Sequence, residues 1–308
     1  MEIKYSIIVP HYNTSDYLSK LLSTIPKRSE IQVLVIDDNS TIEEEKLRQV
    51  IKDDDRCEFY TNTTGIQSAG ACRNIGLSHA LGKWIIFADA DDYFTDEFVK
   101  SLNVYYNSPV DLVYFTPTSI YLGTQKKTGR HILYEGLIYE YQRKSNTKNE
   151  LNLRYRFCCP VSKMIKRDMI QKNDIVFEQT PVANDIVFNT KVGFYTKSFE
   201  VTDKIIYCIT KSRNTLTTTV KEEYFDTRLD VLIRRYGFLR EHLSRKEIRK
   251  LDITGQLVLY EALTKFGVKK FFKTVNRLLA NGVKLYSFST FNLKMSARSL
   301  VDRVFSRI

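Results

Sequence analysis

The sequence predicts an α/β fold, with a doubly wound, mostly parallel central sheet flanked by helices and a helical C-terminal extension. In the first half of the chain, short β-branched apolar runs alternate with helix-like segments, which is the pattern of repeated βαβ units. Beyond residue 220, apolar residues recur at helical spacing and turn signals are few. The length of 308 residues allows one large domain or two smaller ones, and we expect a boundary between residues 1–220 and 221–308.

Apolar runs rich in valine, isoleucine and aromatic residues predict the strands. Those in the first half of the chain are Tyr5–Val9, Gln32–Ile36, Cys57–Tyr60, Trp84–Ala88 and Asp111–Phe115. Two later strands are expected at Val161–Ile165 and Lys204–Ile209. Because ligands of such sheets bind at the carboxyl ends of the strands, the residues that follow each strand are candidates for a site.

Helices are expected between these strands where start and stop signals bracket an apolar period. Ser15 and Asp16 can cap a first helix that Pro26 stops. Further helices are predicted at Ser68–Leu81 and Asp185–Val192. Both lie beside segments that carry polar residues, so they are expected to border a site.

Two other segments have a different character. Residues 123–156 are polar and aromatic with little periodicity, so we expect a long functional loop or lid there. Val268–Val283 repeats apolar residues at helical spacing and carries basic residues on its other faces. Such a helix either buries its apolar stripe against the body of the protein or lies on an anionic membrane leaflet. The sequence leaves both alternatives open.

Composition is that of a soluble globular protein, with 43% hydrophobic and 27% charged residues. The five cysteines are odd in number and include no C-x-x-C pair, which disfavours a disulfide framework or a zinc ribbon. The N-terminus enters a strand directly, without the pattern of a signal peptide, and no apolar run approaches the ~18–20 residues that span a bilayer. We therefore expect a cytoplasmic protein.

The positive charge is concentrated in the C-terminal segment. Residues 1–220 carry 28 Lys+Arg against 27 Asp+Glu, whereas residues 221–308 carry 19 against 9. A neutral body with a basic extension indicates an anionic surface such as a membrane leaflet, and not nucleic acid. The expected location is the cytoplasm. Peripheral attachment to the inner face of the plasma membrane is the alternative left open.

An acidic cluster follows the strand Trp84–Ala88, where Asp89, Asp91 and Asp92 place three carboxylates within four residues. Such groups repel one another unless a cation neutralises them. Mn²⁺ and Mg²⁺ favour oxygen ligands, and substrate phosphates complete their coordination. We expect a metal and diphosphate site here; a solvated acidic turn is the alternative.

Polar groups also follow the first two strands. The first ends in His11, Tyr12 and Asn13, whose aromatic and amide groups could stack on a base and bond to it. The second ends in Asp37 and Asp38, and a carboxylate there can accept a hydrogen bond from an imide N–H, as uracil offers, or from ribose hydroxyls. The alternatives are an ordinary strand-to-helix turn and an Asx-turn.

A glycine-rich run at Gly65–Gly76 and two arginines complete the candidates. The run lacks the G-x-G-x-x-G spacing of a dinucleotide site, and its glycines could equally allow tight packing of a helix on the sheet. Arg73 within it could reach a nucleotide. Arg213 follows the last predicted strand.

These motifs occur in a fixed order. The set SIIVPHYN, VIDDNS, GIQSAGACRNIGL and FADADD resembles the inverting family 2 glycosyltransferases of GT-A fold, over roughly residues 4–215. The resemblance implies that Asp38 contacts the base, with Pro10, Tyr12 and Asn13 beside it. Arg73 matches the family arginine of the R-N-x-G segment. Arg213 lies where similar enzymes carry a basic residue, and that similarity implies contact with a departing diphosphate.

The resemblance also assigns the catalytic groups. It places the D-x-D motif at Asp89-Ala90-Asp91, with Asp89 near the ribose or diphosphate and Asp91 as the metal ligand. The catalytic base maps to Asp185, with Asn184 in place of the usual glutamate. A carboxylate there takes a proton from the acceptor hydroxyl as that oxygen attacks the anomeric carbon; a helix N-cap is the alternative role for Asp185.

The expected activity is metal-dependent, inverting transfer of a single sugar from a nucleotide-sugar, a UDP-sugar, to a hydroxyl of a glycan or lipid-linked acceptor in bacterial surface-polysaccharide synthesis. The Q-x-x-R-W motif of processive synthases is absent. One alternative is a sugar-nucleotide nucleotidyltransferase, which would carry a basic, glycine-rich loop after the first strand, where this chain has HYNTSD. The other is a non-catalytic, membrane-associated scaffold of the same fold.

Overall fold

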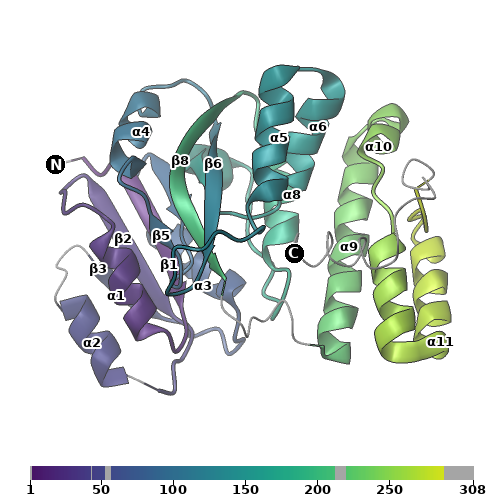
Figure 1. The fold of residues 1–308 in the computed structure, drawn as a ribbon, viewed down its shortest axis with the longest axis horizontal. Coiled ribbons are helices and arrows are strands. Elements are labelled where there is room, and N and C mark those ends of the chain that lie inside the picture. The colour runs from purple at the N-terminus through teal and green to yellow at the C-terminus, as the bar shows by residue number, and fades with distance from the viewer. Residues whose placement is uncertain (1, 43, 53–56, 212–219, 288–308) are drawn as a thin grey trace.

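The computed structural model describes residues 2–42, 44–52, 57–211 and 220–287. Within them, an eight-stranded sheet has the order β3-β2-β1-β4-β7-β6-β8-β5. Its strands are β1 (Tyr5–His11), β2 (Ile31–Asp37), β3 (Cys57–Thr61), β4 (Trp84–Phe87), β5 (Tyr93–Phe94), β6 (Leu112–Tyr121), β7 (Lys163–Lys166) and β8 (Phe199–Lys211). Figure 1 shows helices on both faces of this curved sheet.

The sheet is mostly parallel, as the sequence predicts. Neighbouring strands β3, β2, β1 and β4 are parallel to one another, and so are β6 and β8. Only β7 and β5, among the described strands, run against their neighbours. The carboxyl ends of β1, β2 and β4 therefore meet at one edge, which is where the candidate residues lie.

Both faces of the sheet are covered. Alternate residues of β1 belong to different apolar clusters: Ile7 and Val9 pack on one side, and Ile8 packs on the other. Strands with two buried faces read as continuous apolar runs, which explains why their positions were predictable. The helices of this part are α1 (Ser15–Ser23), α2 (Glu44–Lys52), α3 (Ala69–His79), α4 (Phe98–Tyr105), α5 (Ile132–Arg143), α6 (Thr147–Arg156), α7 (Arg167–Lys172) and α8 (Asp185–Tyr195).

The expected long loop at 123–156 was wrong, because α5 and α6 occupy most of it. The helical period was hard to see because α5 buries only Ile138 fully. A start signal was present: the Asn146 side chain accepts hydrogen bonds from the next backbone N–H groups and caps α6. The capping expected of Ser15 and Asp16 was also wrong, since Thr14 is the N-cap residue and makes no side-chain cap bond.

The helical C-terminal extension is confirmed. It contains α9 (Glu222–His242), α10 (Arg245–Leu251) and α11 (Gln256–Ala280), and α11 is broken at Gly267, whose φ is 84°. Figure 1 shows the two legs of α11 beside α9. Phe225 of α9 packs with Leu259 and Leu278 of α11 in one apolar cluster. The boundary expected at residue 220 adjoins the undescribed residues 212–219 and stays a prediction.

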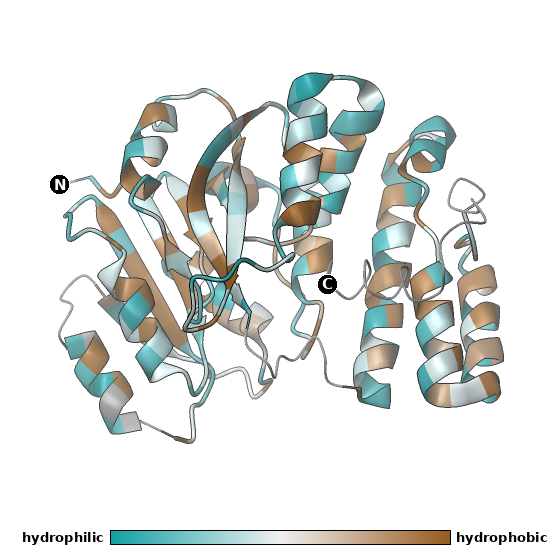
Figure 2. Ribbon diagram, in the orientation of Figure 1, coloured by the Kyte–Doolittle hydropathy of each residue, from teal (hydrophilic) through white to brown (hydrophobic). Residues whose placement is uncertain are grey.

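Neither alternative for the Val268–Val283 stripe describes its packing fully. Leu278 and Val283 are buried within the extension, whereas Val268 and Phe272 are 60% and 59% exposed. Hydrophobic colour accordingly runs along the central strands in Figure 2, while α9 and α11 alternate between hydrophobic and hydrophilic residues. No helix in the described ranges has the length and apolarity needed to cross a membrane.

Candidate functional site

His11 and Asp37 hold the carboxyl ends of β1 and β2 together. His11 Nδ1 donates to Asp37 Oδ1 at 2.9 Å, and Nε2 accepts from the Thr14 backbone N–H at 3.2 Å. Burial acts to raise the pKa of Asp37, but hydrogen bonds from His11 and Ser40 outweigh it and lower that pKa. The imidazole is fully buried and both of its ring nitrogens bond to protein groups; contact of His11 with a nucleotide stays a prediction.

Asp38 lies one residue beyond this pair and is 6% exposed. Its Oδ1 accepts a hydrogen bond from Asn62 Nδ2 at 2.6 Å, and its backbone N–H donates to the His11 carbonyl at 2.8 Å. Asn62 follows β3 and was not predicted from the sequence as a site residue. Its position after a strand was the available signal. The two bonds fix the Asp38 carboxyl at the edge of the sheet.

In the turn after β1, the side chain of Tyr12 is exposed and that of Asn13 is hydrogen-bonded. Tyr12 is 42% exposed and therefore accessible to a ligand. The Asn13 side-chain oxygen accepts from the backbone N–H groups of Thr41 and Ile42, at 2.9 and 3.1 Å, so this amide joins the β1 and β2 loops. Pro10 is partly buried beside them.

Arg73 joins two distant motifs. Its Nη2 donates to Asp89 Oδ1 at 2.6 Å, and its Nη1 donates to Asn184 Oδ1 at 2.9 Å. The guanidinium lies over the Phe177 ring, 5.3 Å from its centroid. Its Nε is buried and has no acceptor within the part of the chain that the structure describes.

The glycine-rich run brings Arg73 there by allowing α3 to pack tightly. A Cβ at Gly76 would collide with Ile8 of β1, and one at Gly70 would collide with the Glu178 carbonyl. Ser68 is the N-cap of this helix, and its hydroxyl accepts from the Gly70 backbone N–H. The packing alternative therefore accounts for these two glycines.

The three carboxylates of the acidic cluster have different surroundings. Asp92 is buried, and its Oδ1 accepts from the Thr210 backbone N–H at 2.6 Å, so it ties this turn to β8. Asp89 is partly exposed and paired with Arg73. Burial, and then repulsion from Asp89, raises the pKa of Asp91 to about 6. A cation bound beside Asp91 would favour its ionised form.

Arg130 is a cation beside this cluster that was not predicted from the sequence as a site residue. Its Nη1 donates to the Thr210 carbonyl at 3.0 Å, and its charge acts to lower the pKa of Asp91. It lies between β6 and α5 in the segment predicted to be a functional loop. Arg213, the other proposed diphosphate contact, lies outside the described residues.

Asp185 is the first residue of α8, and Asn184 takes the N-cap position without making a side-chain cap bond. The N-cap alternative for Asp185 is therefore wrong. Burial raises the pKa of the Asp185 carboxyl and Asp89 adds to this, whereas the charges of Arg73 and Lys163 act to lower it. A carboxyl balanced in this way can accept and release a proton.

The carboxylates of the acidic cluster are suited to a cation that a substrate also binds. Across the described ranges, no three His, Cys, Asp or Glu side chains converge as metal ligands. A Mg²⁺ or Mn²⁺ ion bound with a diphosphate needs only one or two protein carboxylates, and Asp91 and Asp89 would be the residues to hold it here. Their hard oxygen atoms match both ions.

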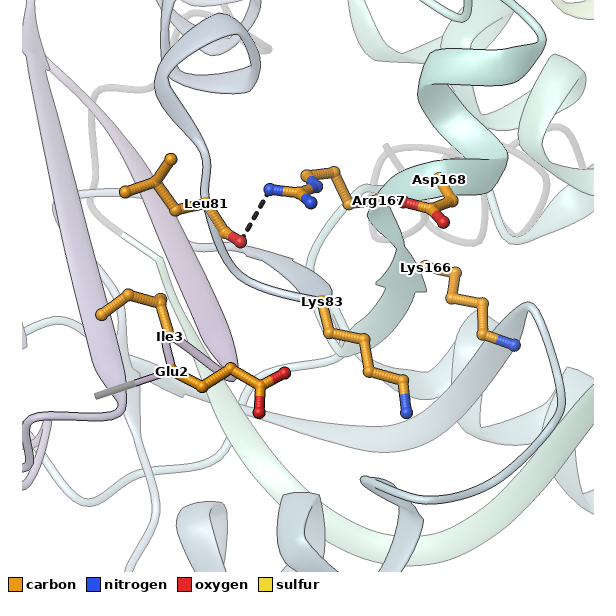
Figure 3. Close-up of a pocket in the computed structure, with 7 residues that line it drawn as sticks. All are labelled: Glu2, Ile3, Leu81, Lys83, Lys166, Arg167 and Asp168. Atoms are coloured by element: carbon orange, nitrogen blue, oxygen red, sulfur yellow. Dashed lines mark hydrogen bonds between the residues drawn. The ribbon is translucent and has the colours of Figure 1, made fainter.

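A separate hollow lies at the other end of β4. Figure 3 shows Leu81, Lys83 and Arg167 around it, with the Arg167 guanidinium bonded to the Leu81 carbonyl at 2.6 Å. These residues precede β4 or follow β7, so they lie away from the carboxyl ends of the parallel strands. The hollow is therefore distinct from the candidate site.

Comparison with known families agrees with this arrangement. The model described as "Glycosyl transferase family 2" matches residues 6–173, which is more than half of the chain. The chain belongs to this family. The resemblance predicted from the sequence motifs is thereby confirmed.

Curated relatives of this family 2 member include the poly(ribitol-phosphate) beta-N-acetylglucosaminyltransferase TarS of Staphylococcus aureus. It is 26% identical over 225 residues, which cover 68% of this chain and 36% of TarS. The GalNAc(5)-diNAcBac-PP-undecaprenol beta-1,3-glucosyltransferase of Campylobacter jejuni is 34% identical over 29% of this chain and 30% of its own length. The chain thus spans about a third of the length of these relatives.

Solved structures show the same fold. TarS residues 1–349 with UDP-GlcNAc superpose with a TM-score of 0.60 at 20% identity, covering 98% of this chain and 79% of that one. The mannosyltransferase PcManGT of Pyrobaculum calidifontis, with GDP-Man and Mn²⁺, gives 0.58 at 14% identity, covering 99% and 84%. The GT-A fold expected from the sequence is confirmed.

Proposed function

We propose that this family member is an inverting, metal-dependent glycosyltransferase that moves one sugar from a UDP-sugar to a hydroxyl of a glycan or lipid-linked acceptor in bacterial surface-polysaccharide synthesis. The observation that carries the proposal is the bridge made by Arg73. It links Asp89 of the D-x-D motif to Asn184, the residue before Asp185. This bridge supports the proposal because it brings the segment assigned to the donor close to the segment assigned to the acceptor.

The donor base is assigned to the edge formed by β1 and β2. Asp38 accepts from the imide N–H of uracil, with Pro10, Tyr12 and Asn13 around the base. The fixed carboxyl of Asp38 and the exposed ring of Tyr12 support this assignment. A preformed polar edge of this kind selects for the base and orients the rest of the donor.

The diphosphate is assigned to the acidic turn and the arginines. Asp91 would hold Mn²⁺ or Mg²⁺, with Asp89 as a further ligand, and the ion would neutralise the charge of the leaving diphosphate. Arg73, which pairs with Asp89, would add positive charge beside the diphosphate. Arg213 is retained as a proposed contact from sequence alone.

Asp185 is assigned as the base. Its carboxylate accepts the proton of the acceptor hydroxyl while that oxygen bonds to the anomeric carbon. The bond between that carbon and the diphosphate oxygen breaks, and UDP leaves from the opposite face. Attack from the opposite face inverts the anomeric configuration. The raised pKa of Asp185 makes it a better proton acceptor than an ordinary aspartate.

The location is proposed to be the cytoplasmic face of the membrane, with residues 221–308 on the anionic surface. Exposed Val268 and Phe272 support this, together with exposed Lys269 and Lys273 in the same turns. Apolar and basic side chains together are what an interfacial helix needs. A lipid-linked acceptor would be reached at that surface.

The decisive experiment measures UDP release and the anomeric product. UDP-GlcNAc is the first donor to test, because it is the ligand named for the TarS structure. Poly(ribitol phosphate) and undecaprenyl diphosphate saccharides are the first acceptors, since the relatives' names include them. Cation-dependent release of UDP with a β-linked product supports the proposal; release of pyrophosphate from UTP, or no turnover of any donor in a panel, contradicts it.

A further inference from the structure

Lys163, the first residue of β7, is a charged side chain in the interior of the protein. It is 1% exposed, and its Nζ donates to the Phe157 carbonyl at 2.7 Å and to Asn189 Oδ1 at 2.6 Å. The ammonium group lies 4.6 Å from the centroid of the Phe157 ring and 5.5 Å from that of Tyr114. No role assigned above uses this lysine directly.

Burying this ammonium group costs free energy because the charge loses its hydration, so filling space in the core does not explain why a lysine stands here. Desolvation lowers the pKa of Lys163 to about 8, although the neighbouring Cys159, Cys158 and Asp185 act to raise it. An apolar side chain of similar length would fill the same space without desolvating a charge. The specific bonds of Lys163 therefore indicate what the charge does.

Asn189 carries the contact from Lys163 to the proposed base. It lies one turn after Asp185 on α8 and is 1% exposed. Its Nδ2 donates to the Asp185 carbonyl at 2.9 Å and to the Cys158 carbonyl at 2.6 Å. Each polar atom of this amide is therefore engaged, and its orientation is fixed by Lys163.

We propose that Lys163 is a positioning residue which acts through Asn189 to fix the first turn of α8, and so directs the Asp185 carboxylate at the acceptor hydroxyl. The inference rests on the proposed role of Asp185 as base. The chain of hydrogen bonds begins at Lys163 on β7, passes through Asn189 and ends at the backbone carbonyl of Asp185. A buried network whose members are all bonded specifies one geometry.

Lys163 also contributes charge. The titratable and charged groups that interact with Asp185 are Arg73, Asp89, Lys163, Tyr134 and Cys159. Of these, Arg73 and Lys163 are the cations that favour the ionised carboxylate. Loss of Lys163 should therefore leave Asp185 protonated to a higher pH, in addition to loosening α8.

The test compares Lys163→Met with Lys166→Met. Lys166 ends the same strand and donates to the Pro109 carbonyl at 2.8 Å, away from Asp185. With UDP-GlcNAc hydrolysis as the probe, we expect kcat to fall about 100-fold in Lys163→Met, as for a misplaced catalytic group, with the affinity for UDP unchanged. The acid limb of the kcat profile should move to higher pH. Lys166→Met should keep the wild-type profile.

A second variant and a second measurement keep the test decisive. Asn189→Leu should give the same loss, and the double variant should be no worse than either single one, because the two residues act in one chain of bonds. Amide hydrogen exchange over residues 185–190 should accelerate in Lys163→Met and not in Lys166→Met. Additive losses, or unchanged exchange with unchanged kcat, would overturn the inference.

These outcomes separate the inference from the proposed function. If the wild-type protein hydrolyses UDP-GlcNAc and Asp185→Asn does not, the role of Asp185 stands whatever Lys163→Met does. If Asp185→Asn is fully active, the proposed base is wrong, while the exchange data still report whether Lys163 orders α8. Equal losses of UDP affinity and kcat in Lys163→Met would show a general structural role and contradict positioning.

Discussion

The guanidinium of Arg73 on α3 donates to the carboxylate of Asp89, in the turn after β4, at 2.6 Å. Its other amino group reaches Asn184, 111 positions along the chain. In Asn184 an amide stands where the family pattern has a carboxylate. Arg73 is therefore shared between one charged and one neutral partner, which leaves more of its positive potential for a ligand.

Arg73→Lys should lower kcat/KM for UDP-GlcNAc by roughly 10- to 100-fold. A lysine keeps the charge but cannot form both bonds in the plane of a guanidinium. Steady-state UDP release measures this effect. Arg167→Lys, at the opposite end of β4, is the matched control and should retain wild-type kinetics; equal losses in both variants would remove the special role of Arg73.

Asp91→Asn should abolish the cation dependence of UDP binding and reduce turnover to background. An amide retains one oxygen but loses the charge that attracts Mn²⁺ or Mg²⁺. Calorimetric titration of UDP with and without Mn²⁺ measures it. Asp92→Asn is the informative contrast, because Asp92 bonds to the Thr210 backbone: it should reduce thermal stability while cation-dependent binding persists.

Asp185→Asn should leave UDP-GlcNAc affinity intact and reduce transfer by roughly 10²- to 10⁴-fold, the usual contribution of a general base. The amide has the same shape and cannot accept the proton. Single-turnover UDP release at saturating donor measures the chemical step. Asp168→Asn, beside the hollow in Figure 3, should have no effect. A parallel loss of affinity in Asp185→Asn would assign it to donor binding.

The sequence predicted the strands and the polar groups that follow them, because a strand buried on both faces leaves a continuous apolar run and its polar tip is adjacent in sequence. Contacts between residues far apart in the sequence were predicted less well. Arg130 meets Thr210 across 80 positions, and Lys163 meets Asn189 across 26, and no local spacing encodes either pair. Nor does the sequence of a strand tip reveal that Asp37 and Thr14 occupy both ring nitrogens of His11.

Acid should destabilise the protein partly through Asp37. Its pKa in the folded protein is lowered, so its contribution to stability is complete above the unfolded-state pKa of about 4 and is lost as the pH falls through the lower folded value. Asp37→Asn should cost about 1–2 kcal/mol at neutral pH and weaken this acid dependence. Urea unfolding between pH 7 and pH 3 measures both, and an unchanged pH slope would contradict the assignment.

The exposed apolar residues of α11 should bind the protein to anionic vesicles. Val268 and Phe272 are more than half exposed, and Lys269 and Lys273 are exposed on the same leg of the helix. Among residues 256–287, Glu261 is the only acidic residue, and it is paired with Arg228 at 2.7 Å. A surface with these charges is attracted to phosphatidylglycerol, and each lysine near it contributes about 1 kcal/mol.

Flotation with phosphatidylglycerol and phosphatidylcholine vesicles measures this binding. Val268→Ser with Phe272→Ser should reduce recovery on anionic vesicles, and Lys269→Glu with Lys273→Glu should abolish it, with little binding of any variant to phosphatidylcholine. Val104→Ser is the matched control, since Val104 is 71% exposed on α4, outside the extension. If the α11 variants instead change the mass of the protein in solution and leave flotation unaltered, this face binds a second copy of the chain and the membrane assignment is wrong.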